Sequence, residues 1–299
     1  MPEIAQPRSC FIQVGESRLH YVSHGDPTAP TLLLVHGMRD HARSWDWIAA
    51  AFAERFHVIA VDLRGHGDSS WARPAAYGLA AFVLDLAILI DALALQQIAL
   101  IGHSLGGAIA LRYAAAFPDR VKSMVVIEGI ELPIIRDERA APIPFPNRMR
   151  TWIKAEGERR GREARGYATI ADAERRMVEA QPDIDCKTVA YLAEHGVIRA
   201  ADGLWRWKYD NAIRLRAPDD PDGCDLDQTL AAIACPTLLA YGEASWIPLP
   251  PPERLALICD HRIVRFPDAS HWLHHQARAA FIAAVRTFLN ISTKGPDHA

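Results

Sequence analysis

The stretch Ile98-Ala-Leu-Ile-Gly-His-Ser-Leu-Gly-Gly107 decides how this chain folds, because a strand, a sharp bend and a helix follow one another within it. The apolar run 98–101 predicts a buried parallel strand, and the small and apolar residues 105–117 predict the helix after it. The glycines beside the bend let two backbones meet where Cβ atoms would clash. Ser104 is therefore expected in a strained turn, with its hydroxyl exposed at the carboxyl edge of the sheet.

Two backbone amides are expected to face that hydroxyl. The amide of Leu105 belongs to the first turn of the helix, where N–H groups have no partner inside the helix. A second apolar run, Thr31-Leu-Leu-Leu-Val35, ends at His36-Gly37, where the chain must turn tightly. The amide of Met38 can then donate to a developing oxyanion from the other side. Gly-x-Ser-x-Gly alone is a weak signal, but its strand-and-helix context favours a catalytic serine.

Strand and helix patterns alternate along most of the chain. Residues 10–23 alternate apolar with polar around Gly15, which predicts an antiparallel hairpin at the sheet edge. Buried strands are predicted at 57–61, 121–127, 236–241 and 262–266, and helices at 45–55, 79–95, 254–259 and 275–289. This alternation predicts an α/β fold whose mostly parallel sheet has helices on both faces.

The alternation breaks between residues 130 and 227, where a proline-rich stretch precedes charged, helical segments. We therefore expect a core made of residues 1–129 and 228–299, with a cap inserted at 130–227. Trp205 and Trp207 lie in this insertion. Two interpretations stay open for them: they face a pocket, or they form the small core of the cap itself.

Composition excludes several classes of partner. The 299 residues are 50% hydrophobic with a net charge of −3, which argues against a nucleic-acid partner. The five cysteines lack Cys-x-x-Cys spacing, which indicates a reducing compartment rather than a disulfide framework. No apolar run reaches the roughly 18 residues of a membrane span, and the first eight residues lack a signal-peptide core. We expect a cytoplasmic monomer or homodimer that acts on a small molecule with an apolar portion, without a cofactor.

A histidine follows the last predicted strand, in Pro267-Asp-Ala-Ser-His271. A loop at the carboxyl end of a parallel strand reaches the same side of the sheet as Ser104. An imidazole titrates near neutrality, so His271 is the expected base for the serine hydroxyl. His271 and His275 have the spacing of a metal-binding pair, but no carboxylate completes a ligand set, so no metal site is predicted.

Taken together, His36-Gly37, Asp62-Leu-Arg-Gly-His-Gly-Asp-Ser69, Gly-His-Ser104-Leu-Gly-Gly and Ser-His271-Trp resemble the α/β-hydrolase fold superfamily. The resemblance implies an eight-stranded sheet, a nucleophilic Ser104, His271 as general base and the amides of Met38 and Leu105 as oxyanion donors. It also implies that the insertion is a lid that shapes substrate choice. The polar, glycine-rich stretch at 62–69 is expected to form a hydrogen-bonded turn rather than to act in catalysis.

The third member of the triad departs from the common pattern of the family. Most relatives place an aspartate three residues after the glycine that ends the strand at 236–241, and here that residue is Ser245. Some relatives place the acid after the preceding strand, where Val-Val-Ile-Glu128-Gly stands in this chain. An imidazolium needs an anion at its far nitrogen, so Glu128 is the expected acid and Glu243 the alternative.

Serine at position 104 favours hydrolysis of a carboxylic ester, lactone or thioester through an acyl-enzyme. Two alternatives stay open: carbon–carbon bond hydrolysis of a diketone with the same triad, and a receptor-like binding protein with little turnover. Arg39 could hold a substrate carboxylate or, as is more ordinary, pair with Asp40 or another acid. The residues expected to line the pocket are Arg39, His103, Trp205, Trp207, Trp246 and Trp272.

Overall fold

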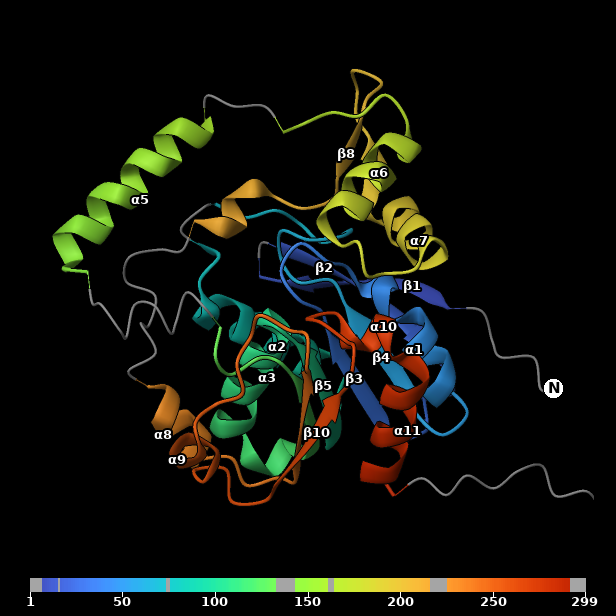
Figure 1. Cartoon of the computed structure of the whole chain (residues 1–299), viewed down its shortest axis with the longest axis vertical. Coiled ribbons are helices and arrows are strands. Elements are labelled where there is room, and N and C mark those ends of the chain that lie inside the picture. The colour runs from blue at the N-terminus through green and yellow to red at the C-terminus, as the bar shows by residue number, and fades with distance from the viewer. Residues whose placement is uncertain are drawn as a thin grey trace, which may run out of the picture.

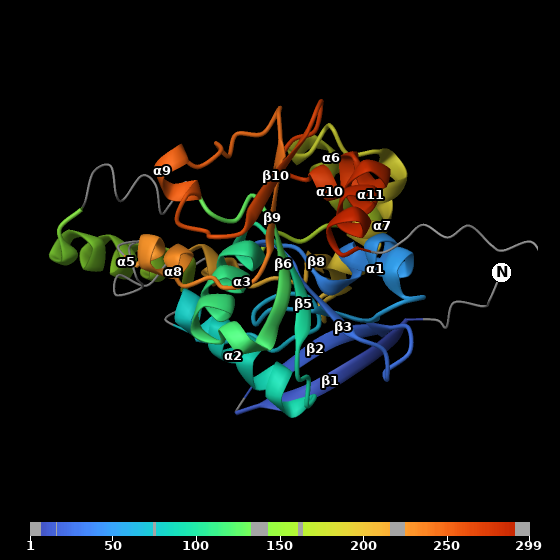
Figure 2. The same ribbon diagram turned by 90° about the horizontal axis from the view of Figure 1, so that it is seen from below.

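A twisted eight-stranded sheet forms the centre of the computed structural model, which describes residues 7–15, 17–73, 76–132, 143–160, 164–215 and 225–290 (Figures 1 and 2). Across the sheet, the strands are β1 (Arg8–Val14), β2 (Ser17–His24), β4 (His57–Val61), β3 (Thr31–Val35), β5 (Ile98–His103), β6 (Val121–Ile127), β9 (Thr237–Gly242) and β10 (His261–Phe266). β2 runs antiparallel to both β1 and β4, and the other neighbours are parallel. The expected edge hairpin and mostly parallel sheet are confirmed.

Helices cover both faces of the sheet. Successive side chains of a strand point to opposite faces, and β3 shows the consequence. Leu33 and Val35 pack on one side with α2 and α3, whereas Leu32 and Leu34 pack on the other with α1 and α11. The helices are α1 (Asp46–Phe52), α2 (Leu79–Ala92), α3 (Leu105–Ala116), α8 (Leu226–Ala231), α9 (Pro252–Leu255), α10 (Leu273–Gln276) and α11 (Arg278–Phe288), with short 3₁₀ helices η1 (Ala42–Trp45) and η3 (Pro118–Arg120).

Between β6 and α8 the chain leaves the sheet. This segment contains α5 (Phe145–Arg160), α6 (Ile170–Ala180), α7 (Cys186–Gly196), the two-stranded sheet of β7 (Val197–Arg199) and β8 (Trp205–Trp207), and η4 (Asn211–Arg214). Figure 1 shows α5 extending away from the sheet, while α6 and α7 lie together near α1. Arg278 of α11 donates to the Thr188 hydroxyl of α7 at 2.8 Å, which ties α7 to the sheet-covering helices.

Parallel order brings the carboxyl ends of β3, β5, β6, β9 and β10 to one edge of the sheet. Ligand sites of open α/β sheets form at this edge. His36, Ser104 and Glu128 each directly follow one of these strands. None of the described helices is both long and apolar enough to cross a bilayer.

Candidate active site

Ser104 occupies the bend between β5 and α3 with φ 53° and ψ −117°, a conformation that side-chain-bearing residues rarely adopt. The bend is held by the Ser104 amide, which donates to the Ile127 carbonyl at 2.8 Å, and by the Ala108 amide, which donates to the Ser104 carbonyl at 3.0 Å. A Cβ on Gly106 would lie 2.2 Å from the Val35 carbonyl oxygen. Glycine is therefore required where the helix begins, and the expected strained turn is present.

The loop after β3 lies directly against this bend. A Cβ on Gly37 would come 3.2 Å from the Ser104 Cβ and 2.8 Å from Nδ1 of His103. His36 fixes the loop, because its Nδ1 lies 2.7 Å from the Gly37 carbonyl and its Nε2 accepts from the Leu63 amide at 3.1 Å. Burial and the neighbouring His66 lower the pKa of His36 to about 3, so this ring is neutral. Met38 is thereby placed in the same cavity as Ser104.

Glu128 follows β6 with a positive φ of 48°, and its side chain is completely buried. Its Oε1 accepts from the Gly242 amide at 2.8 Å. Its Oε2 accepts from the Ser245 hydroxyl at 2.6 Å and lies 2.6 Å from Nδ1 of His271. A buried carboxylate needs such partners, and here all three come from the neighbouring strand end and the loop after β10.

His271 is held in one orientation. Because its Nδ1 lies against a carboxylate, the neutral ring carries its proton on Nδ1 and leaves Nε2 as an acceptor. Its backbone carbonyl lies 2.9 Å from Nε2 of His103. The ring is 4.8 Å from that of Trp246 and 5.2 Å from that of Trp272, between ring centroids. This tautomer is the one that a general base requires.

Glu243 is placed differently. Its amide donates to the Phe266 carbonyl at 3.0 Å, and its carboxylate pairs with the exposed Arg265 at 3.5 Å. The structure therefore brings Glu128 rather than Glu243 to His271.

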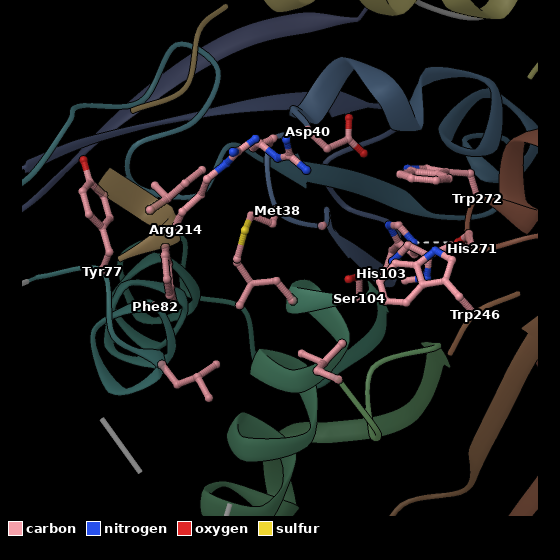
Figure 3. A pocket seen from close by; sticks show the side chains of 16 residues that line it. Met38, Asp40, Tyr77, Phe82, His103, Ser104, Arg214, Trp246, His271 and Trp272 are labelled. Atoms are coloured by element: carbon pink, nitrogen blue, oxygen red, sulfur yellow. Dashed lines mark hydrogen bonds between the residues drawn. The ribbon is translucent and has the colours of Figure 1, made fainter. Parts of the chain in front are cut away.

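A cavity of about 380 Å³ opens beside Ser104 (Figure 3). Ser104, His103 and His271 gather at one end, with Trp246 and Trp272 beside them. Most of the remaining wall is apolar. The lining residues are Gly37, Met38, Arg39, Asp40, Tyr77, Leu79, Phe82, His103, Ser104, Leu105, Leu132, Ile213, Arg214, Trp246, His271 and Trp272.

Two expected pocket residues need correction. Trp205 and Trp207 lie on β8 and pack against the small cluster of Tyr167, Ala173 and Val197. The Trp207 indole also donates to the Tyr167 hydroxyl at 3.3 Å. They form a local core of the insertion, because two strands of only three residues each bury little without large aromatic side chains.

The loop after β4 is a hydrogen-bonded turn. Asp62 accepts from the amides of Ala42 at 2.6 Å and Asp68 at 2.8 Å, and it lies 2.6 Å from the His20 ring. Burial opposes ionisation, but these hydrogen bonds and the nearby imidazoles lower the pKa of Asp62 to about 2. Arg64 meanwhile pairs with the buried Asp85. These groups join β4 to its neighbours and stand outside the cavity.

Two groups of potential metal ligands lie close together in the described chain: Asp40 with His103 and His274, and His20 with Asp62 and Asp68. Asp40 and Asp62 already accept hydrogen bonds from the protein, and the Asp68 carboxylate pairs with Lys208 at 2.8 Å. His271, whose spacing from His275 suggested a metal pair, is turned to Glu128 instead.

Sequence reasoning missed three groups. From the sequence, Ser245 is only the residue that replaces an expected aspartate. In the structure its hydroxyl donates to Glu128, the acid that contacts His271. Arg214 and Tyr77 line the cavity from η4 and from the segment before α2. Neither belongs to a motif, so only the assembled fold brings them to Ser104.

Comparison with known proteins agrees with the fold. A family model described as "Alpha/beta hydrolase family" matches residues 32–284. The putative carbamate hydrolase RutD of Variovorax paradoxus is 31% identical over 243 residues, which cover 80% of this chain and 83% of that protein. Esterase Rv0045c of Mycobacterium tuberculosis is 30% identical over 218 residues, covering 73% and 67%.

Other relatives match in part or in structure. An uncharacterized M. tuberculosis protein is 38% identical over 102 residues, so the match spans only 30% of its length. A thioesterase domain from the curacin biosynthetic pathway superposes with a TM-score of 0.79 at 25% identity, covering 93% of this chain and 98% of that domain. The chain therefore belongs to the alpha/beta hydrolase family.

Proposed function

We propose that this hydrolase cleaves a carboxylic ester, lactone or thioester through an acyl-enzyme formed on Ser104. The observation that carries the proposal is the 2.6 Å contact between Glu128 and Nδ1 of His271, at a cavity that Ser104 also lines. A buried carboxylate fixes the imidazole tautomer that accepts a proton at Nε2, and this is what activates a serine hydroxyl. The relatives named as an esterase and a thioesterase support the same reaction class.

In this mechanism Ser104 Oγ attacks the carbonyl carbon while His271 Nε2 takes its proton. The amides of Met38 and Leu105 donate to the oxyanion, and Glu128 stabilises the imidazolium. Among the described residues no carbonyl accepts from either amide, which leaves both free for this role. His271 then protonates the leaving group, and in the second half it activates water that releases the acid and restores Ser104.

We also propose that residues 130–227 form the cap. Ile213 and Arg214 of this insertion line the same cavity as Ser104, which supports a role of the insertion in covering the site. The proposal that the insertion is a lid depends on the position of these two residues in the cavity wall.

Reaction with a fluorophosphonate probe tests the proposal directly. We expect the probe to label the protein on Ser104, and we expect Ser104→Ala to abolish labelling while the variant keeps the melting temperature of the parent. Steady-state hydrolysis of p-nitrophenyl butyrate should fall at least about 10³-fold in this variant, since residues of a triad act as a unit. Labelling followed by a single burst without steady-state turnover would favour the receptor alternative.

A further inference from the structure

Two cationic side chains line the same cavity as the nucleophile. Arg39 lies in the turn after β3 with φ 63°, and Arg214 ends η4. Figure 3 shows Arg214 on the far side of Met38 from Ser104 and His271. A residue other than glycine in this left-handed conformation is strained, and such strain persists where it serves to aim a side chain.

Neither arginine has a carboxylate partner within the described ranges. The Arg39 guanidinium interacts with the neutral hydroxyl of Tyr209. By contrast, Arg43 pairs with Asp46 at 2.8 Å, and Arg254 pairs with Asp227 at 2.8 Å. The two cations that line the cavity thus have no carboxylate partner among the described residues, whereas Arg43 and Arg254 do.

The carboxylates nearest to this region are committed elsewhere. Asp40 accepts from the His41 amide at 2.8 Å and from the Ser44 hydroxyl at 3.0 Å. Asp210 accepts from the Tyr77 hydroxyl at 2.9 Å and from the Ala212 amide at 2.9 Å. The expected pairing of Arg39 with Asp40 is absent, although the two residues are adjacent.

Two positive charges that line the same cavity, those of Arg39 and Arg214, are unfavourable there without an anion. Burial, followed by the charge of Arg214, lowers the pKa of Arg39, which means that the two cations repel each other in a partly desolvated site. A carboxylate between them would remove the repulsion, and the planar guanidinium matches its geometry. The wall of the same cavity also carries apolar side chains, among them Met38, Leu79, Phe82 and Leu132.

We propose that the substrate carries a second, unreacted carboxylate, which Arg39 and Arg214 bind while an apolar chain spans the cavity to a scissile carbonyl at Ser104. The substrate class is then a monoester or monothioester of a medium-length dicarboxylic acid. This inference rests on the proposed function, because it takes Ser104 as the reacting end.

Paired substrates test the inference. The p-nitrophenyl hemiesters of adipic and suberic acid are compared with p-nitrophenyl alkanoates of the same carbon number, which lack the terminal charge. We expect kcat/KM to favour the hemiesters, and Arg39→Gln or Arg214→Gln to lower it for hemiesters by about 10- to 100-fold, mainly through KM. The same variants should lower kcat/KM for the alkanoates much less, so that the hemiester-to-alkanoate ratio of kcat/KM falls toward one. Arg214→Lys should restore part of the loss.

Arg265→Gln is the matched control, because Arg265 is exposed on β10 and pairs with Glu243 away from the cavity. This variant should leave kcat/KM unchanged for both the hemiesters and the alkanoates. Equal kcat/KM for hemiesters and alkanoates, or equal losses on both in the arginine variants, would overturn the inference while leaving the acyl-enzyme intact.

Calorimetric binding of monomethyl adipate to the Ser104→Ala variant, which lacks the nucleophile, gives a readout that does not depend on turnover. It should bind this variant more tightly than neutral dimethyl adipate, and adding Arg39→Gln or Arg214→Gln should abolish this difference. If Ser104 is not labelled by fluorophosphonate, the proposed function fails, and the calorimetry still decides whether the cavity selects a carboxylate. Equal binding of the monoester and the diester would overturn the inference on its own.

Discussion

At the scale of single residues, Glu128 links three elements. It follows β6, accepts from the Gly242 amide at the end of β9, and contacts His271 after β10. Ser245 stands where the family resemblance led us to expect an aspartate, and it donates to the same oxygen that faces His271. The carboxylate that contacts the imidazole therefore comes from the end of β6, and a serine occupies the position after β9 where an aspartate was expected.

This arrangement predicts different results for two conservative substitutions. Glu128→Gln keeps the size of the side chain but can present an NH₂ group to His271, which favours the wrong tautomer and removes the charge that stabilises the imidazolium. We expect kcat for p-nitrophenyl butyrate to fall by about 10³- to 10⁴-fold. Glu243→Gln is the control, because its exposed carboxylate pairs only with Arg265 among the described residues. The reverse order of effects would reassign the acid to Glu243.

At the scale of elements, the bend from β5 into α3 depends on close backbone contact. A Cβ on Gly106 would lie 2.2 Å from the Val35 carbonyl oxygen and 2.6 Å from that of His36, and neither atom can move without displacing β3. Gly157, in the middle of α5, has no atom within 4 Å of the same position. Gly106 is therefore required by close backbone contact, whereas no contact requires a glycine at position 157.

We expect Gly106→Ala to lower the free energy of unfolding by at least about 2 kcal/mol, because the overpacked strand and helix must separate. Gly157→Ala should instead stabilise the protein by up to about 1 kcal/mol, through the lower helix propensity of glycine. Urea denaturation followed by circular dichroism measures both. Equal changes in the free energy of unfolding for the two variants would mean that the close backbone contact at the bend does not determine the cost of a Cβ there.

Elements of the sheet were predictable because their signals are local. The continuous apolar run at 98–101 and the Gly-His-Ser-Leu-Gly bend fix a strand, a turn and a helix without reference to the rest of the chain. The predicted helix at 254–259 was less accurate, since α9 spans Pro252–Leu255 and begins at a proline that the apolar pattern ignores. The sequence did not predict β8, because a three-residue strand depends on tertiary contacts. It did not predict Arg214 in the cavity wall for the same reason.

At the scale of the whole molecule, the chain buries an unusual set of histidines around the site. Burial lowers the pKa of His36 to about 3, of His66 to about 4 and of His275 to about 3. Burial also holds the pKa values of His103 and His274 well below the usual value. In the unfolded chain each of these rings titrates near pH 6.5, so the unfolded state binds more protons than the folded state in mildly acidic solution.

Stability should therefore be complete above about pH 7.5 and fall as the pH drops through 6.5 toward the folded-state pKa values. Each neutral ring contributes a loss of up to about 1.4 kcal/mol per pH unit in that range, and several rings act together. Urea midpoints at pH 7.5, 6.5 and 5.5, at constant ionic strength, measure the slope. His274 stacks on Trp45 at 4.8 Å between ring centroids, so His274→Phe keeps the contact, removes one titrating group and should flatten the slope. A midpoint that stays constant from pH 7.5 to 5.5 would show that these rings take up protons in the folded state as readily as in the unfolded chain.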